Sequence, residues 1–467
     1  MTKVRPSKLI AGLALLIGAT AAAAAPAHPQ AEAQALDLAK RAIALRSVAG
    51  PGNQTPQVAE LFKSALVGGG FAAADVTITP VDTTAYLIAR WRGSDPSLKP
   101  IVISGHMDVV EAKPSDWQRD PFTPVIENGY LFGRGAADMK LDGAIAIASL
   151  IELRRQGFRP RREIVLEFSG DEETSMKTSA IIAEKLANAD MAINIDVGSG
   201  RLDEKTGKPL FLAWQAAEKG YADFELTVTN PGGHSAEPSP DNAINQLAAA
   251  LVRIGNYHFT PELSELTRAY FTSAARYRDA KTGAAMRAFA ANPKDGAAIA
   301  VLRAIPAMIG QIGTTCVATM ISGGHAQNAL PQRATANINC RIFPGHKPAE
   351  IMAQLKTVAA EPAVTIRDVT EGAVASDASP LLPRLSGAIT RAMAAAYPGV
   401  PAFPRMDESA SDSMWFRAKG VPSYSASPIF LKDSDDHLTH GLNERVPLAA
   451  IAPAITYYLV LLPELTK

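Results

Sequence analysis

The stretch Pro100-Ile-Val-Ile-Ser-Gly-His106-Met-Asp108 shows the pattern on which this sequence is built. Its β-branched residues predict a short strand that ends in a histidine and, two residues later, a carboxylate. An imidazole binds a metal ion through one ring nitrogen, and a carboxylate that accepts the hydrogen of the other nitrogen orients the ring. We therefore expect His106 to bind a metal ion and Asp108 to orient it. A surface histidine beside a loop aspartate would give the same local pattern.

Two further segments carry acidic residues to the ends of predicted elements. A glycine-rich loop, Gly133-Arg-Gly-Ala-Ala-Asp138, runs into a predicted helix at 144–155, and a strand-like run at 163–169 is followed by Gly170-Asp-Glu172-Glu173. Asp138 could bridge two cations, or it could be an ordinary helix N-cap. Adjacent glutamates point in different directions, so one could bind metal while the other moves protons; a solvated acidic turn is the alternative.

The same arrangement recurs in two later segments. Ala192-Ile-Asn-Ile-Asp196 is an apolar run that ends in a carboxylate, and His437-Leu-Thr-His440-Gly supplies a late histidine. Each pattern is weak by itself. In an alternating β/α chain, however, the C-terminal ends of successive strands converge on one crevice of an open sheet. Together these segments predict a two-metal hydrolase site.

These segments resemble the di-zinc metallopeptidase family that includes glutamate carboxypeptidase, carnosine-type dipeptidases, aminoacylase and succinyl-diaminopimelate desuccinylase. The resemblance covers about the whole chain after the first 27 residues. Two more stretches resemble the lid signatures of that family: 218–238, which contains Pro231-Gly-Gly-His234-Ser, and 323–341, which contains Gly323-Gly-His-Ala-Gln-Asn328. The agreement at ordered sites along the chain makes the resemblance specific.

The resemblance implies a role for each candidate residue of the metal site. His106 and Asp196 would hold one Zn²⁺, Glu173 and His440 would hold the other, Asp138 would bridge the two ions, and Glu172 would be the general base. A site rich in carboxylates with two histidines also accepts Co²⁺ or Mn²⁺. The family further implies a cis peptide bond between Asp138 and Met139.

The resemblance also implies catalytic and substrate-binding residues in the lid. His234 would donate a hydrogen bond to the developing oxyanion, and Arg341 and Asn328 would bind substrate, with Arg341 pairing with a free C-terminal carboxylate. A turn histidine and a strand arginine paired with a nearby acid are the alternatives. The segment 408–413 carries serine and alanine where the family usually has a glycine-rich substrate loop, so the shape of the pocket stays open.

The predicted fold class is α/β, a mixed-sheet catalytic domain with an inserted α+β lid. No proposed ligand lies between Asp196 and His440, so we place the lid at 218–371 and the catalytic domain at 28–217 and 372–467. The resemblance suggests a homodimer through the lid, in which the lid histidine reaches the site of the partner subunit. An alanine-rich stretch between His258 and Gln311 carries aromatic residues that we expect to be plain core.

The first 27 residues predict a secretory signal, because a cationic start precedes an apolar stretch that ends in Ala25-Pro-Ala27. An uncleaved leader is the alternative. We therefore expect an exported, periplasmic or secreted protein with no stable membrane anchor after signal removal. The 46 basic residues match the 46 acidic residues, so no cationic surplus indicates a nucleic-acid partner.

The two cysteines lie on two predicted neighbouring strands, 315–322 and 334–343. If Ile321 lies opposite Thr335, then Cys316 lies opposite Cys340, and an exported protein could join them in a disulfide. Two buried free cysteines are the alternative that we favour, since free cysteines often pack as small apolar residues.

The expected activity is hydrolysis of amide bonds in dipeptides or at the C-terminal residue of short peptides. An N-acyl-amino-acid hydrolase would use the same site and would differ only in what fills the acyl side of the pocket. A catalytically inactive peptide-binding protein is a third possibility. The complete set of ligand residues and the presence of Glu172 argue against it.

Overall fold

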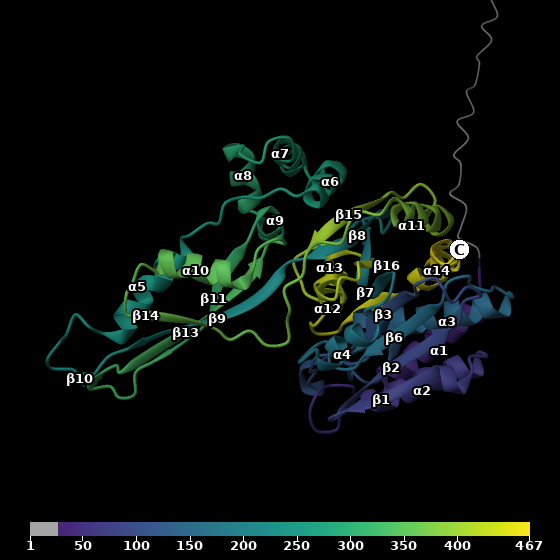
Figure 1. Cartoon of the computed structure of the whole chain (residues 1–467), viewed down its shortest axis with the longest axis horizontal. Coiled ribbons are helices and arrows are strands. Elements are labelled where there is room, and N and C mark those ends of the chain that lie inside the picture. The colour runs from purple at the N-terminus through teal and green to yellow at the C-terminus, as the bar shows by residue number, and fades with distance from the viewer. Residues whose placement is uncertain (1–26) are drawn as a thin grey trace, which may run out of the picture.

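An eight-stranded mixed sheet lies at the centre of the larger part of the protein (Figure 1). The computed structural model describes residues 27–467, so all of the predicted leader except its last residue lies outside the described residues. The strand order is β1-β2-β6-β3-β7-β16-β8-β15, and the central strands β6, β3, β7 and β16 run parallel. The strands are β1 (Val76–Val81), β2 (Thr84–Trp91), β3 (Ile101–His106), β6 (Ile164–Ser169), β7 (Met191–Leu202), β8 (Pro209–Glu218), β15 (Ala402–Asp407) and β16 (Ser423–Leu431).

Helices cover both faces of this sheet, which is why β3 and β6 are buried along their whole length. Ile101 and Ile103 of β3 pack into the core on one face, while Val102 between them packs into the core on the other. The first face is covered by α1 (Pro29–Ile43), α2 (Thr55–Gly68), α3 (Leu141–Arg155), α11 (Pro383–Ala396) and α14 (Ile451–Leu465), and the second by α4 (Lys177–Lys185) and α12 (Ser413–Ala418).

Short elements complete this part of the chain. They are the single turns η1 (Ala73–Asp75), η2 (Pro114–Asp116), η3 (Ala136–Lys140) and η6 (Leu448–Ala450), the helix α13 (Asp433–Asp436), and a small sheet of β4 (Val125–Glu127), β5 (Tyr130–Phe132) and β17 (Arg445–Pro447). The peptide bond between Asp138 and Met139 in η3 is cis, as the family resemblance implied.

A second, antiparallel sheet forms the lid, which extends to the left in Figure 1. Its order is β11-β13-β9-β14, and β13 alternates between buried and partly exposed residues because α5 and α10 cover only one face. The lid elements are β9 (Gly220–Thr229), α5 (Ala243–Gly255), β11 (Thr315–Gly323), β13 (Arg333–Ile342), α10 (Pro348–Ala359) and β14 (Val364–Asp368). A two-stranded tip pairs β10 (Gly233–His234) with β12 (Ala329–Leu330). The predicted fold class is confirmed by this mixed α/β core with its α+β lid.

The helical stretch between the lid strands packs on the large sheet and not on the lid sheet. Phe271 and Phe289 are fully buried in a core that also contains Phe211 of β8 and Phe403 of β15. The stretch comprises α6 (Glu265–Ala274), η4 (Ala275–Tyr277), α7 (Ala280–Ala291), α8 (Gly296–Arg303), α9 (Pro306–Ile309) and η5 (Gly310–Ile312). The proposed domain division put these residues in the lid, and their packing places them against the catalytic part. Tyr270, Phe271 and Phe289 are core residues, as predicted.

The two cysteines form a disulfide between β11 and β13, so the preferred prediction of two free thiols was wrong. Cys316 lies opposite Cys340 as the predicted register required. The register nevertheless differs at the distal end, where Ile321 lies opposite Ala336, because a bulge between Ala318 and Met320 shifts the pairing by one residue.

One stretch among the described residues, Leu448–Leu465, is long and apolar enough to cross a membrane. It comprises η6 and α14. Of this stretch 56% is buried inside the protein, and α14 packs against α3, α11 and β16. It therefore serves as a core helix in this structure.

Candidate two-metal site

The candidate site lies where the parallel strands β3 and β6 end beside the neighbouring strand β7. His106 is the last residue of β3 and pairs in register with Ser169, the last residue of β6. The acidic turn that carries Glu172 and Glu173 follows Ser169 directly, and Asp196 lies on the neighbouring strand β7. The sheet itself therefore brings these side chains to one edge.

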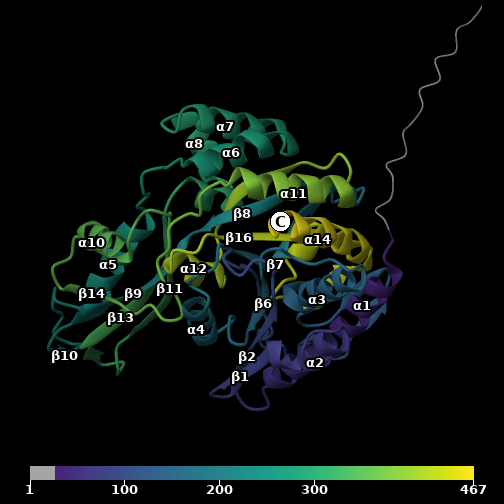
Figure 2. The same cartoon turned by 45° about the vertical axis from the view of Figure 1, so that its right-hand side comes forward.

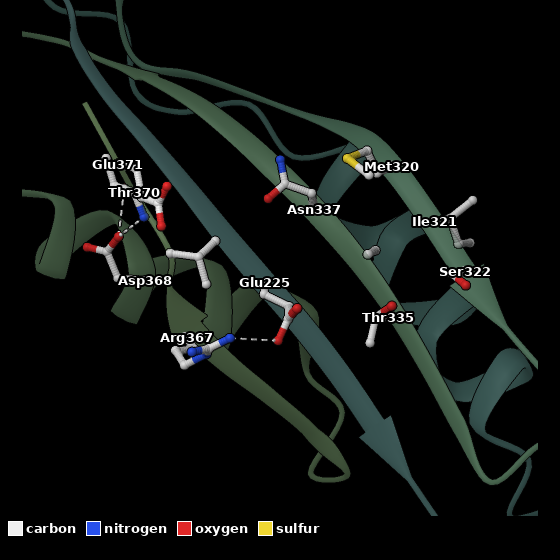
Figure 3. Close-up of a pocket in the computed structure, with 12 residues that line it drawn as sticks. Glu225, Met320, Ile321, Ser322, Thr335, Asn337, Arg367, Asp368, Thr370 and Glu371 are labelled. Carbon is white, nitrogen blue, oxygen red and sulfur yellow. Dashed lines mark hydrogen bonds and ion pairs between the residues drawn. The ribbon is translucent and has the colours of Figure 1, made fainter. Parts of the chain in front are cut away.

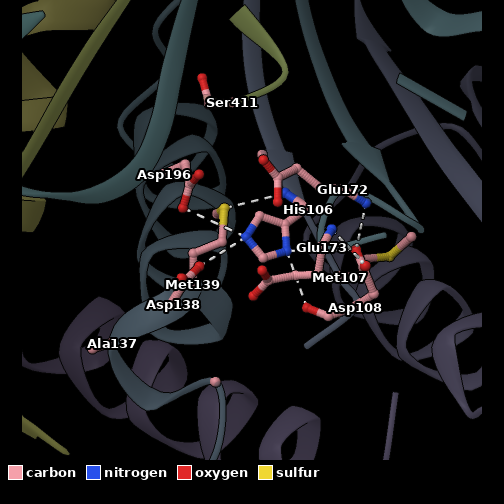
Figure 4. Close-up of polar contacts among 12 residues, drawn as sticks. His106, Met107, Asp108, Ala137, Asp138, Met139, Glu172, Glu173, Asp196 and Ser411 are labelled. Atoms are coloured by element: carbon pink, nitrogen blue, oxygen red, sulfur yellow. Dashed lines mark hydrogen bonds and ion pairs between the residues drawn. The ribbon is translucent and has the colours of Figure 1, made fainter. Parts of the chain in front are cut away.

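Asp138 lies between the two candidate histidines. Figure 4 shows its contact with His106. Its Oδ1 atom is 2.9 Å from Nε2 of His106, and its Oδ2 atom is 3.0 Å from Nε2 of His440. The carboxylate thus offers one oxygen to each imidazole, which is the arrangement needed for a residue that bridges two cations. It caps no helix with its side chain, and α3 begins only at Leu141.

The remaining carboxylates divide between the two histidines. Oε1 of Glu173 is 2.9 Å from Nε2 of His440, and Oδ1 of Asp196 is 3.5 Å from Nε2 of His106. The buried Oδ1 atom of Asp196 has no hydrogen-bond partner among the described residues. The pairing of Asp196 with His106 and of Glu173 with His440 is the one that the family resemblance implies.

Asp108 orients the site differently from the sequence expectation. Nδ1 of His106 is 3.0 Å from the main-chain carbonyl oxygen of Asp108, whereas the nearer carboxylate oxygen is 3.5 Å away. The Asp108 carboxylate instead accepts hydrogen bonds from the main-chain N–H groups of Glu172 and Glu173, at 3.1 and 3.0 Å. Asp108 therefore fixes both the ring of His106 and the turn that carries the two glutamates.

The electrostatics of the cluster are those of crowded buried carboxylates. Burial and the neighbouring Asp138 raise the pKa of Glu173 to about 7, and burial raises the pKa of Glu172 well above its usual range. Hydrogen bonds that His440 donates to the carboxylates of Asp138 and Glu173 raise the pKa of His440 to about 10. Burial opposes the charged form of His106, but Asp196 and the other carboxylates raise its pKa overall. A site with this excess of negative charge is suited to cations.

The donor set fits divalent metal ions. His106, Asp138 and Glu173 each direct one ligand atom into a region where these atoms lie within 4.8 Å of one another. Imidazole nitrogens together with carboxylate oxygens are the ligands of hydrolytic zinc sites. The unpartnered oxygen of Asp196 adds a ligand that no protein hydrogen bond uses.

A cavity of about 340 Å³ opens directly on this cluster. Glu172 lines it together with the candidate ligands Asp138, Glu173, Asp196 and His440. The carboxylate of Glu172 accepts no hydrogen bond from any described residue, and only 8% of the residue is exposed. A carboxylate in this position is shielded from bulk water and, within the described part of the chain, is not held by a protein hydrogen bond.

The serine-containing loop at 408–411 forms one wall of the cavity. Ser411 Oγ donates a hydrogen bond to Glu218, and Asp412 accepts one from Ser169 Oγ at 2.7 Å. Burial raises the pKa of Asp412 to about 7. Ser411 therefore ties this loop to the end of β8, and Asp412, which follows it, ties the loop to β6.

Glu444 supports the site and was not recognised as a functional residue from the sequence. Its fully buried carboxylate accepts hydrogen bonds from the N–H groups of Gly135, Ala137 and Asp138, at 3.1, 2.7 and 3.1 Å. It also pairs with Arg134 at 2.5 Å. Glu444 thus fixes the turn that carries Asp138. In the sequence it lies four residues after His440. The available signal was an acidic residue shortly after the late histidine.

The lid residues lie elsewhere. His234 and Asn328 meet at the exposed lid tip, where the N–H of Ser235 donates to the carbonyl of Asn328 at 3.1 Å. Figures 1 and 2 both show β10 at the far end of the lid from β3 and β7. Arg341 lines a second cavity next to the first and stacks on Tyr221, with 4.7 Å between the guanidinium and the ring centre. The chain's own lid tip therefore does not contribute to its own metal site.

Comparisons with known proteins agree with this geometry. The chain is 27% identical over 396 residues to "Probable carboxypeptidase S-like 2" of Dictyostelium discoideum, covering 82% of this chain and 74% of that protein. It is 28% identical over 383 residues to "N-fatty-acyl-amino acid synthase/hydrolase PM20D1" of Xenopus tropicalis, covering 79% of this chain and 73% of that protein.

Solved structures share the fold. The M20 family metallo-carboxypeptidase Sso-CP2 from Sulfolobus solfataricus superposes with a TM-score of 0.70 at 19% identity, covering 92% of this chain and 98% of that one. Human carnosine dipeptidase 1 gives 0.65 at 16% identity, with 93% and 96% covered. Residues 102–464 match the family described as "Peptidase family M20/M25/M40". The resemblance seen in the sequence is thereby confirmed, and the chain belongs to this family of metallopeptidases.

Proposed function

We propose that this enzyme hydrolyses the amide bonds of dipeptides or releases the C-terminal residue of short peptides. The observation that carries the proposal is that both imidazoles, His106 and His440, meet on Asp138 beside a cavity that also contains the Glu172 carboxylate. The relatives named as carboxypeptidases and dipeptidases support it.

Two Zn²⁺ ions are the proposed cofactors, with Co²⁺ or Mn²⁺ as substitutes. His106 and Asp196 would hold one ion, Glu173 and His440 the other, and Asp138 both. When bound, such a pair of ions lowers the pKa of a water molecule and polarises the scissile carbonyl.

Glu172 would act as the general base. Burial raises the pKa of Glu172 well above its usual range, which makes the carboxylate a stronger proton acceptor. Glu172 would accept a proton as the water oxygen adds to the carbonyl carbon. It would then deliver that proton to the amine nitrogen as the carbon–nitrogen bond breaks, so that the products are an amine and a carboxylic acid, which loses its own proton to solvent.

The lid would complete the site in a homodimer. The β11 strand is an open edge of the lid sheet, and its Val317, Met320 and Ile321 are 60%, 70% and 67% exposed. Figure 3 shows Met320 and Ile321 on this edge. They line a hollow of about 650 Å³, and on its other side Arg367 donates to Glu225 at 3.3 Å. An exposed apolar edge strand favours pairing with a second chain. His234 of the partner subunit would then donate to the developing oxyanion, with Asn328 beside it, while Arg341 binds the substrate's C-terminal carboxylate.

Light scattering on a size-exclusion column tests the dimer. We expect the mass of two chains for the unaltered protein and of one chain for Ile321→Lys, because a buried lysine on the edge strand opposes pairing. Val252→Lys, an exposed position on α5, is a matched substitution that tells whether the interface extends from β11 onto the helix. A monomeric unaltered protein would contradict the proposal.

An N-acyl-amino-acid hydrolase is the second candidate activity. The relative named N-fatty-acyl-amino acid synthase/hydrolase supports it, because the same site would cleave an amide with either acyl group. An apolar wall of the second cavity, formed in part by Phe211 and Met308, offers room for an acyl chain.

A panel of dipeptides, tripeptides and N-acyl amino acids distinguishes the two activities. We expect hydrolysis that requires added Zn²⁺, that a chelator abolishes, and that falls at least about 100-fold in Glu172→Gln. Preference for peptides would support the peptidase activity. Preference for N-acyl amino acids would support the N-acyl-amino-acid hydrolase activity. Zinc-loaded protein that cleaves nothing in the panel would contradict both.

We further propose that the protein is exported to the periplasm or secreted, on the basis of its first 27 residues. The Cys316–Cys340 disulfide supports an oxidising compartment. Cell fractionation followed by N-terminal sequencing and thiol titration of the denatured, unreduced protein tests this. We expect exported protein that lacks the leader and has no free thiol; intracellular protein with two free thiols would contradict the proposal.

A further inference from the structure

A second cavity, of about 620 Å³, adjoins the cavity at the metal site. Arg201, Arg405, Glu408 and Asp436 line both cavities, so the two are neighbours that share a wall. The outer wall of the second cavity comes from the helical stretch that packs on β8 and β15, including Tyr270, Arg278 and Met308. A ligand held at the metal cluster could extend into it.

Basic side chains from separate parts of the fold converge on this second cavity. They are Arg201 of β7, Lys219 between β8 and β9, Arg278 before α7, Arg341 of β13 and Arg405 of β15. Arg201 and Arg405 are largely buried, with 19% and 18% of their side chains exposed. Burying arginine groups is costly unless their N–H groups are paired.

Three of these arginines have a buried nitrogen with no hydrogen-bond partner among the described residues. Arg201 pairs with Asp433 at 3.4 Å and with Asp436 at 2.8 Å, and its Nη1 is left over. Arg405 pairs with Asp407, and its Nε is left over. Arg278 makes no ion pair with any described residue, and its Nε is also unpartnered. One nitrogen on each of these arginines therefore lacks an acceptor in the described part of the chain, although acidic residues lie beside Arg201 and Arg405.

The chemistry of the cavity selects its occupant. A carboxylate satisfies several guanidinium N–H groups at once, and such charge-assisted hydrogen bonds are the strong ones. Phe211, Tyr270, Met308 and Ile309 line the same cavity and would contact an aliphatic stem that carries the charge. A group with a short apolar stem and an anionic end fits both surfaces.

We infer that Arg201, Arg278 and Arg405 bind a second carboxylate of the substrate, in addition to the C-terminal carboxylate assigned to Arg341. This inference rests on the proposed amide hydrolysis and names a substrate class for it: peptides or acyl amino acids that carry an extra acidic group. That group is the side chain of the residue released, or the distal end of the acyl part. In either position, the extra acidic group would place its carboxylate against the same three arginines.

Matched substrate pairs test the inference. Ala-Glu against Ala-Gln places the extra carboxylate on the released residue, and N-succinyl-alanine against N-butanoyl-alanine places it on the acyl part. We expect the charged member of at least one pair to have the higher kcat/KM by about 10- to 100-fold, the range for a charge-assisted hydrogen bond.

Arg278→Gln is the informative variant, because Arg278 lies on the half-buried rim and supports no ion pair. We expect it to reduce the charged-to-neutral ratio about 10-fold. Arg276→Gln is the matched control, since Arg276 is exposed, stacks on Tyr277 and does not line the cavity. An unchanged ratio in Arg276→Gln with a lowered ratio in Arg278→Gln supports the site.

The outcomes separate this inference from the proposed function. If neutral and charged substrates are cleaved equally, or if Arg278→Gln keeps the full ratio, the hydrolase stands and the second-carboxylate site is refuted. If no substrate is cleaved, the proposed function fails, and calorimetric titration with glutarate decides the site alone. Glutarate binding that Arg278→Gln weakens and Arg276→Gln does not would support the site, and the absence of binding would refute it.

Discussion

The metal-ligand cluster and the lid tip were both predicted as parts of one site, yet only the cluster is assembled within the chain. His106, Glu172, Glu173 and Asp196 stand on or just after neighbouring strands of one sheet, where register sets their separation. His234 and Asn328 instead lie on a two-stranded tip at the end of a long arm. Strand order therefore determines the position of the first group, whereas the second depends on how the arm meets another surface.

The largest effect is expected from a substitution that removes a catalytic group of the cluster and keeps its metal ligands. Glu172→Gln removes the proton acceptor but no ligand, so we expect kcat to fall about 10²- to 10⁴-fold. Metal content measured by mass spectrometry should stay unchanged, and Glu60→Gln, an exposed acid on α2, should behave like the unaltered enzyme. Activity of Glu172→Gln within a few-fold of normal would remove Glu172 from the mechanism.

The next effect tests whether the lid tip acts in the partner's site. His234→Ala should lower kcat about 10²- to 10³-fold, the value of one oxyanion donor, whereas His258→Ala, an exposed lid histidine far from the tip, should not. Subunits of His234→Ala and Glu172→Gln, mixed and allowed to exchange, should regain about a quarter of normal activity. Half of the random dimers would then contain one intact site.

No recovery in that mixture, although exchange is shown by a tag on one subunit, would mean that His234 acts within its own chain or not at all. In that case the lid would have to fold over its own metal site. The separation of the lid tip from the cluster would then be that of an open state of a single subunit.

A smaller effect concerns the support behind Asp138. Glu444→Gln weakens the acceptor that holds the N–H groups of Ala137 and Asp138, so we expect metal affinity to fall about 10- to 100-fold. Competition with a chromogenic chelator measures it. Normal metal affinity in a folded variant would show that the turn carrying Asp138 holds its geometry without Glu444.

The smallest effect lies where the lid meets the helical stretch. His346 pairs with Glu262 at 2.8 Å, and this hydrogen bond raises its pKa above 6.5. A group whose pKa is higher in the folded than in the unfolded protein stabilises the fold. This stabilisation is complete at pH values below the unfolded-state pKa and is lost as the pH rises through the folded-state pKa. Because 39% of the side chain is exposed, screening limits the contribution. His346→Gln should cost at most about 0.5 kcal/mol at about pH 5.5 and nothing at about pH 9 in urea unfolding. If His346→Gln loses the same stability at both pH values, the positive charge of His346 is not the source of the stabilisation.

Much of the catalytic part could be predicted from sequence because its signals are local. The apolar strand that ends at His106 was predicted together with the edge at which it ends. The apolar run before Asp196 was also predicted as a strand, but that strand, β7, continues past the ligand to Leu202. The disulfide depended on the register of two strands, and the bulge near Thr319 left the Cys316–Cys340 pairing intact while it shifted Ile321.

Other features need tertiary information that no local pattern holds. The convergence of Arg201, Arg278 and Arg405 joins two strands and a helical insertion that are distant in sequence. The support of Asp138 by Glu444 likewise joins residues separated by about 300 positions. Packing of the helical stretch on β8 and β15 could not be read from its alanine-rich composition, which fits either sheet.

The central claim is that the strand-end cluster holds two metal ions bridged by Asp138. Metal analysis of purified, dialysed protein after zinc loading tests it most directly, with Asp138→Ala beside Asp37→Ala, an exposed acid on α1. We expect two zinc ions per chain in the unaltered protein and in Asp37→Ala, and the loss of at least one in Asp138→Ala. One ion or none in the unaltered protein, or two ions retained in a folded Asp138→Ala, would contradict it.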